Sequence, residues 1–106
     1  MGISKAILFS EEQNRLAELA KVFAHPARIA IIEYLFKNRT CVVNGLVQDF
    51  PLSQSTISQH LKEMKNAGVI KGEIEGSRIC YCLNSEVMEE LSAKLNQLLG
   101  ELKKCC

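Results

Sequence analysis

The stretch from Leu52 to Lys65 constrains the fold of this 106-residue chain more than any other segment. Ser53 offers an N-cap for a helix. The apolar residues that follow are spaced by four and then three, which buries one face of a helix: Ile57, Leu61 and Met64. The opposite face carries only side chains that hydrogen-bond or meet phosphate: Gln54, Ser55, Ser58, Gln59, Lys62 and Lys65. A helix with this division of faces fits the major groove of DNA, so the stretch predicts a DNA-reading helix.

Two helices are expected nearer the N-terminus. The segment 10–13 has the form of a capping box, which predicts a first helix over 10–23. Its expected buried residues are Leu16, Leu19, Ala20 and Phe23. His25 and Pro26 end it, because the residue before proline is pushed out of the helical region, and Pro26 suits the first position of a second helix. The expected core contacts of that second helix are Ile29, Ile32, Leu35 and Phe36.

The segments on either side of the DNA-reading helix complete a winged helix. A short third helix over 42–50 is ended by Pro51, so a short turn joins it to the DNA-reading helix and makes a helix-turn-helix over 43–67. Gly68 then offers a left-handed C-terminal position. The alternation in 78–83 predicts a half-buried strand, and Gly76 suits the turn of a β-hairpin, or wing, over 69–83. The predicted fold is mainly α with a small β-hairpin, in one winged-helix domain over 1–106.

A last helix is expected over 85–104, capped by Asn84 or Ser85. Its apolar positions form a heptad seam: Met88, Leu91, Leu95, Leu98 and Leu102. One interpretation packs this seam on the chain's own core. We favour the other, a homodimer formed through the N- and C-terminal helices, in which Leu16 and Leu19 join the seam at the interface.

With these elements, the chain resembles the ArsR/SmtB family of bacterial repressors. The resemblance covers 24–28, 52–62, 66–70 and the wing over 76–83. Its most specific part is the pattern Leu-Ser-Gln-x-Thr-[Val/Ile]-Ser-x-His-Leu, which begins here at Leu52. The resemblance implies a dimeric winged-helix repressor that binds an operator near its own gene and is released by a ligand, often a metal ion or arsenite.

Three departures from the family pattern limit what the resemblance carries over. His25 stands where the family usually has aspartate, and is a weaker cap. The cysteine pair that many metal-sensing members carry in the third helix falls on Val42 and Asn44, leaving Cys41 just outside it. The last helix has no histidine, so no zinc site is expected there.

The predicted DNA contacts of the 53–65 helix fall into three groups. Base contacts are expected on the outward side of the first two turns, where glutamine bonds adenine through two contacts. The residues there are Gln54, Ser55, Ser58 and Gln59. Lys62 and Lys65 are expected to meet phosphates, which adds affinity without sequence information. Ser53 is expected to cap the helix beside a phosphate, and Thr56 suits either purpose.

Two further residues have open roles. His60 precedes the buried Leu61, and a half-buried ring against neighbouring side chains or a phosphate is favoured over base contact or metal binding. Arg78, just past the wing turn, is expected either to reach DNA or to pair with Glu73 or Glu75.

Five cysteines are many for so short a chain. One hypothesis is that Cys105 and Cys106, with a third thiol, bind arsenite or another soft ion. The candidates for that third thiol are Cys41, Cys80 and Cys82. A second hypothesis is a redox switch at an exposed cysteine, and a third is that the cysteines are structural or incidental. A direct bond between Cys80 and Cys82 is disfavoured, because positions i and i+2 of a strand lie about 6.5 Å apart.

Composition limits the remaining possibilities. A net charge of +1 is too small for a non-specific nucleic-acid binder, so a local patch and two subunits are needed for DNA. The chain has no Gly-rich phosphate loop and no nucleophile elbow, so an enzyme is not expected. It has no signal-peptide pattern and no apolar run near membrane-spanning length, which predicts a cytoplasmic protein with reduced thiols. The alternative to a DNA-binding repressor is a winged-helix module that binds only proteins.

Overall fold

The computed structural model describes residues 7–37, 50–75 and 78–104, with side chains outside 73–79. Its elements in chain order are α2 (Glu11–Val22), α3 (Pro26–Lys37), α5 (Gln54–Asn66), β1 (Ile70–Glu75), β2 (Arg78–Leu83) and α6 (Ser85–Leu102). The predicted third helix lies outside these residues except for its last position. The other predicted helices and the hairpin are confirmed, with ends within two residues of the predicted ones.

The starts of the helices follow from local chemistry. Ser10 and Gln13 form the predicted capping box, in which each backbone N–H donates to the other residue's side chain at 3.0 Å. Pro26 is the first residue of α3, where its missing N–H costs no hydrogen bond. The Ser53 hydroxyl accepts from the backbone N–H of Thr56 at 3.3 Å and caps α5 as predicted.

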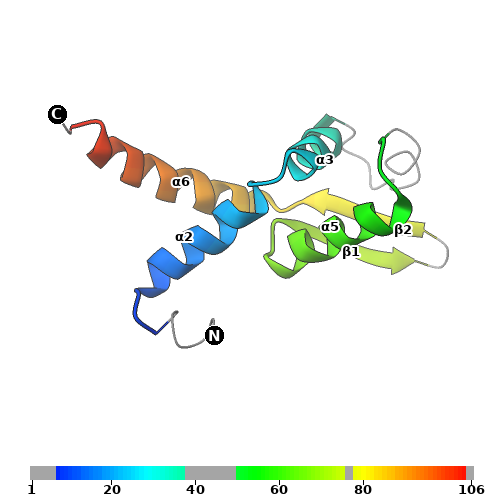
Figure 1. Cartoon of the computed structure of the whole chain (residues 1–106), viewed down its shortest axis with the longest axis horizontal. Helices are drawn as coiled ribbons and strands as arrows, with labels where there is room; N and C mark the ends of the chain where they lie inside the picture. The colour runs from blue at the N-terminus through cyan, green and yellow to red at the C-terminus, as the bar shows by residue number, and fades with distance from the viewer. Residues whose placement is uncertain (1–6, 38–49, 76–77, 105–106) are drawn as a thin grey trace.

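The hairpin follows α5 directly and gives the predicted winged-helix fold (Figure 1). β1 and β2 pair in antiparallel register from Ile70 opposite Leu83 to Glu75 opposite Arg78. At its base the hairpin rejoins α5, because Val69 and Ile70 are buried in the same core as the helix. The wing and α5 are therefore supported by the same core.

The core is formed where α2, α3, α5, β1 and α6 meet. Fully burying one Leu, Ile or Met side chain contributes about 1.5–3 kcal/mol. The buried apolar residues are Leu19, Val22, Ile31, Leu35, Ile57, Leu61, Met64, Val69, Ile70 and Leu91. The predicted apolar face of α5 is thus confirmed in full.

The predicted buried face of α3 is partly wrong. Ile29 and Phe36 are exposed by 36% and 61%, whereas Ile31 is fully buried. The charged Arg28 is buried with it. The helix is turned so that positions 28, 31 and 35 face inward. Because apolar residues surround most of this helix, their spacing did not define its inward direction. The same kind of error affects α2, where Ala20 is exposed and Val22 is buried.

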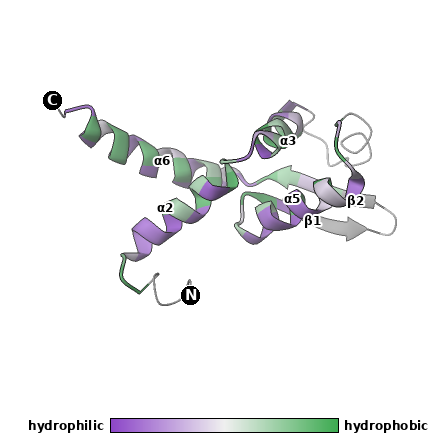
Figure 2. Ribbon diagram, viewed as in Figure 1, coloured by the Kyte–Doolittle hydropathy of each residue, from purple (hydrophilic) through white to green (hydrophobic). Residues whose placement is uncertain are grey.

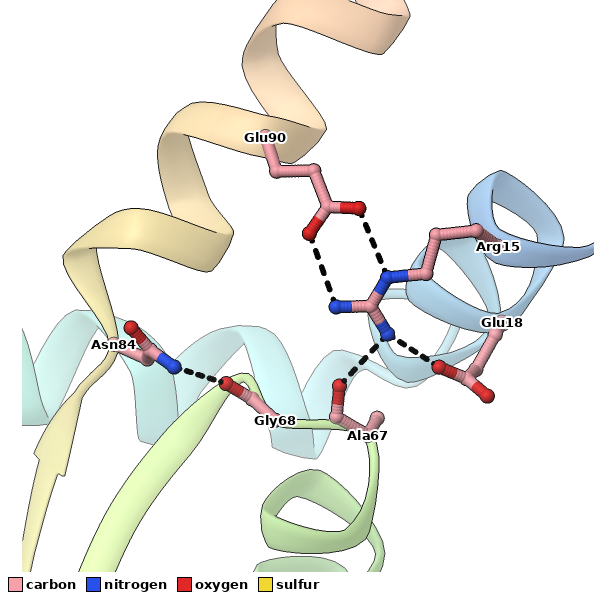
Figure 3. Close-up of polar contacts among 6 residues, drawn as sticks. All are labelled: Arg15, Glu18, Ala67, Gly68, Asn84 and Glu90. Carbon is pink, nitrogen blue, oxygen red and sulfur yellow. Dashed lines mark hydrogen bonds and ion pairs between the residues drawn. The ribbon is translucent and has the colours of Figure 1, made fainter. Parts of the chain in front are cut away.

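Side chains from distant elements hold the C-terminal end of α5 (Figure 3). Gly68 adopts the predicted left-handed conformation with φ of 84°. Its carbonyl accepts from Asn84 Nδ2 at 3.0 Å. Asn84 occupies the predicted N-cap position of α6, but its side chain makes no cap hydrogen bond. The amide instead ties the start of α6 to the end of α5.

Arg15 of α2 makes a second connection to the same end of α5. Its Nε and Nη2 donate to the two carboxylate oxygens of Glu90 in α6, at 3.0 and 3.1 Å. Nη1 donates to the Ala67 carbonyl at 3.2 Å and also pairs with Glu18 (Figure 3). The hydrogen bond from Arg15 lowers the pKa of Glu90 below its ordinary value. One guanidinium therefore joins α2, α6 and α5.

From this junction, α2 and α6 extend to one end of the elongated molecule (Figure 1). The described chain measures 50 × 32 × 24 Å. Apolar residues continue along α6 toward its C-terminal end (Figure 2). Leu98, Leu99 and Leu102 there are 45–53% exposed. No helix in the described ranges has the length and apolar content needed to span a membrane.

Candidate nucleic-acid interface

The outward face of α5 is exposed along its whole length. The exposed residues are Gln54, Ser55, Thr56, Ser58, Gln59, Lys62, Glu63, Lys65 and Asn66. They include the residues of α5 that the sequence assigns to base or phosphate contact. The cap residue Ser53 is also exposed, whereas His60 is half-buried. The buried residues Ile57, Leu61 and Met64 fix the direction of this face, since they attach the opposite side to the core.

The N-terminal turn of α5 is suited to a phosphate. The Ser53 hydroxyl lies 3.1 Å from that of Ser55 and 2.9 Å from that of Thr56. The first turn contains no acidic residue. Its unpaired N–H groups and the helix dipole favour an anion at this end. Because the first turn has no acidic side chain to fill this place, the anion must come from outside the helix.

His60 lies behind this face and is half-buried. Its Nδ1 accepts a hydrogen bond of 3.0 Å from Arg28 Nε. Because Arg28 Nε is only a donor, Nδ1 is unprotonated and the neutral ring carries its proton on Nε2. The His25 ring lies 5.7 Å away, centroid to centroid. The contact with neighbouring side chains that the sequence favoured for His60 is therefore confirmed.

Arg28 is a functional candidate that sequence reasoning missed. It is only 5% exposed, and its Nη2 pairs with the Glu63 carboxylate. A buried charge needs such partners, because leaving water is costly for an unpaired ion. The signal was present in the sequence, since Arg28 is the one charged residue among apolar ones in 26–32.

The pairing also changes the charge balance of the interface. Glu63 alone would repel phosphates beside Lys62, but Arg28 neutralises it. Lys21 and His25 stand on the same side and, with Arg28, line a shallow cavity of about 490 Å³ against α5. The α5 residues that line it are Ser55, Thr56, Gln59, His60 and Glu63. Lys21 of α2 and His25, just before α3, therefore adjoin a patch that the sequence placed on α5 and the wing alone.

The wing carries Arg78, which the sequence predicts either to reach DNA or to pair with Glu73 or Glu75. Arg78 lies opposite Glu75 in the strand register, beside the wing turn. Its side chain and the turn at 76–77 lie outside the described parts, so both roles predicted for Arg78 stay predictions. Lys71 on β1 is exposed.

The described cysteines are both on β2 of the wing, Cys80 opposite Glu73 and Cys82 opposite Lys71. Cys82 is exposed and free, whereas Cys80 is half-buried and disulfide-bonded. Since Cys82 is free, the two are not bonded to each other, as predicted. The expectation of fully reduced thiols does not hold for Cys80. A disulfide sulfur offers no thiolate, so Cys80 ligates a soft ion only after reduction.

No group of three metal-ligating side chains occurs within the described ranges. Three of the candidate thiols, Cys41, Cys105 and Cys106, fall outside those ranges. The proposed soft-ion site is therefore not tested by this geometry.

Known proteins share both the sequence pattern and the fold. Residues 25–71 match the family described as "Bacterial regulatory protein, arsR family". The transcriptional repressor PagR of Bacillus anthracis is 38% identical over 77% of this chain and 82% of its own length. The chain belongs to the ArsR family. It is accordingly a DNA-binding transcriptional regulator with a winged helix-turn-helix.

Further ArsR-family similarities agree with the arrangement of elements. The crystal structure of PagR has a TM-score of 0.62 at 37% identity, covering 79% of this chain and 95% of that one. The arsenical resistance operon repressor of Staphylococcus aureus is 23% identical over 87% of this chain and 88% of its own. An ArsR family regulator, RHA00566, gives a TM-score of 0.77 at 16% identity over 92% and 100% of the chains, which shows the shared fold.

We predict that acidification weakens the fold through His60. Burial lowers the pKa of His60 below its ordinary 6.5, and the charges of Arg28 and His25 lower it further. The stability from the neutral ring is therefore complete above 6.5 and is lost as the pH falls from there toward the folded-state pKa.

Urea unfolding at about pH 7.5 and about pH 5.5 measures this loss, on either side of the ordinary histidine pKa. We expect His60→Gln, whose amide oxygen also accepts from Arg28, to lose less stability on acidification than the natural chain. His25→Gln serves as the control for the second histidine. Equal acid sensitivity in the natural and His60→Gln proteins would contradict the prediction.

Proposed function

We propose that this ArsR-family protein represses transcription as a homodimer whose two α5 helices enter successive major grooves of an operator. The observation that carries the proposal is the exposed polar face of α5, held from behind by three buried apolar residues and by Arg28. PagR and the S. aureus relative are both named as repressors, which supports the direction of regulation.

The roles proposed on α5 follow from reach and chemistry. Gln54 and Gln59 contact base edges, where an amide both donates and accepts. Ser55 and Ser58, which lie between the two glutamines on α5, contact bases or the DNA backbone. Lys62 and Lys65 contact phosphates. Ser53, already used as the cap, leaves the free N–H groups of the first turn for a phosphate.

The dimer proposal rests on the apolar surface that one chain leaves uncovered. Leu98 and Leu102 of α6 are about half exposed, and Leu16 lies beside Leu98 in a groove of about 290 Å³ between α2 and α6. Leu19 and Leu91 are buried in the chain's own core, so they support this surface from inside. Two copies joined here gain the phosphate contacts that a chain of net charge +1 lacks.

Replacing the proposed base contacts should change specificity, whereas replacing the lysines should change affinity. We expect Gln54→Ala or Gln59→Ala to weaken binding to a duplex from the gene's own promoter region by about 5- to 100-fold, with little effect on a scrambled duplex. Lys62→Ala should weaken binding to both duplexes and reduce the salt slope by about 1 per subunit.

Fluorescence anisotropy at several salt concentrations measures these effects. Lys103→Ala is the matched control, because Lys103 is exposed just beyond α6, whose C-terminal end lies away from α5 (Figure 1). Equal binding of both duplexes by the natural protein, with no effect of either glutamine, would overturn the proposed role of α5.

A charge in the apolar seam of α6 should separate the dimer. We expect Leu98→Glu to sediment as a monomer at concentrations where the natural protein is a dimer, because the carboxylate would lose its water at the interface. Ala93→Glu adds the same charge at an exposed position outside the seam and should leave the dimer intact. A dimeric Leu98→Glu protein would rule out this interface.

We further propose that thiol chemistry releases the repressor from DNA. The disulfide of Cys80, in strand β2 of the wing, favours a redox response, in which two thiols lose two protons and two electrons to an oxidant. The alternative is coordination of arsenite by Cys105 and Cys106 with a third thiol, which the name of the S. aureus relative favours.

The two mechanisms predict different cysteine requirements. If arsenite is the signal, it should release reduced natural protein from its duplex, and Cys105→Ser with Cys106→Ser should abolish that release. If oxidation is the signal, hydrogen peroxide should release the protein and Cys80→Ser should abolish the effect. In the oxidation experiment, Cys82→Ser is the control for loss of a thiol, because Cys82 is free. Release by arsenite that persists in the double serine variant would exclude the terminal cysteines as its site.

A further inference from the structure

We propose that Arg28 and Glu63 are positioning residues for sequence recognition, which orient the Gln59 amide before DNA arrives. Arg28 lies in α3, whereas Glu63 and Gln59 lie one turn apart on α5. The inference rests on the proposed base contact of Gln59, and it names side chains that act on that contact without touching DNA.

The first step is the fixed position of the guanidinium. Arg28 is 5% exposed, so it is held by its partners and has little room to change conformation. Its Nε donates to His60 Nδ1 at 3.0 Å, and its Nη2 donates to Glu63 Oε2. Both partners are on α5, so the guanidinium contacts this helix at two points.

The second step is the orientation of the Glu63 carboxylate. With Oε2 committed to Arg28, Oε1 is turned toward the Gln59 side chain and accepts from its Nε2 at 3.3 Å. An ionised carboxylate only accepts, so the nitrogen end of the Gln59 amide faces Glu63. The carboxyl side chain is 45% exposed, and without Arg28 it would be free to turn into solvent.

The third step is what the fixed amide offers to a base. Nε2 keeps a second N–H, and Oε1 has no hydrogen-bond partner among the described residues. Adenine presents an acceptor at N7 and a donor at N6 in the major groove, which match these two groups. An amide free to flip exchanges its donor and acceptor ends, whereas one held by Glu63 does not. Such preorganisation lowers the ordering cost of the contact.

Selection from a random duplex library tests this relay from Arg28 through Glu63 to Gln59, whatever the operator sequence is. The natural protein should select a motif, and Gln59→Ala should lose the base preference at one position of each half-site. We expect Glu63→Gln to weaken the preference at that same position by about 5- to 10-fold, since a neutral amide no longer fixes which end of Gln59 faces it. Preferences at the other positions should remain.

A second variant separates positioning from folding. Glu63→Asp keeps the charge that pairs with Arg28 but shortens the side chain by one methylene, which withdraws Oε1 from Gln59. It should fold like the natural chain by circular dichroism and show the same loss of preference. Glu33→Gln removes one carboxylate at an exposed position of α3 and should leave the motif unchanged.

The outcomes distinguish the inference from the proposed function. If the natural protein selects no motif, the proposed function itself is wrong. If it selects a motif and Gln59→Ala alters no position, or if both Glu63 variants keep the full preference at the Gln59 position, the relay is wrong while the DNA-reading role of α5 stands. Loss confined to that position in Glu63→Asp supports the relay.

Discussion

Helix α5, which we propose reads the DNA, depends on a guanidinium buried behind it. Arg28 is isolated from water, and the two groups that satisfy it, His60 and Glu63, both belong to α5. A charge in this position is strongly destabilising if one partner is removed, so α3 and α5 are joined by more than apolar contact. The same pairing neutralises the one acidic residue of α5, which leaves its exposed face free of unpaired negative charge.

The C-terminal end of α5 connects it to the helices proposed to form the dimer. Arg15 of α2 bonds Glu90 of α6 and the Ala67 carbonyl, while Asn84 bonds the Gly68 carbonyl. Both carbonyls lie at the end of α5, where a helix leaves acceptors unsatisfied. A change in the relation of α2 to α6 therefore has a direct path to the end of α5.

Local signals were sufficient for most of the fold. The capping box of Ser10 and Gln13, the proline that begins α3, the Ser53 cap and the left-handed Gly68 each act within a few residues, so the sequence revealed them. The sequence did not reveal which face of α3 is buried, because apolar residues occur on several faces of this helix. The Asn84 side chain was misassigned for a related reason. Its preferred partner was a carbonyl from another element, which local capping rules do not include.

The exposed face of α5, its apolar back and the hairpin that follows it were determined by the sequence, since helical and strand periodicities are properties of neighbouring residues. The family pattern in the same stretch added its function as a DNA-binding regulator. Only the tertiary structure decided that Arg28 lies under His60 and Glu63, residues more than thirty positions away. Side chains so far apart in the chain meet only when the core has packed, so no spacing within either segment predicts the contact.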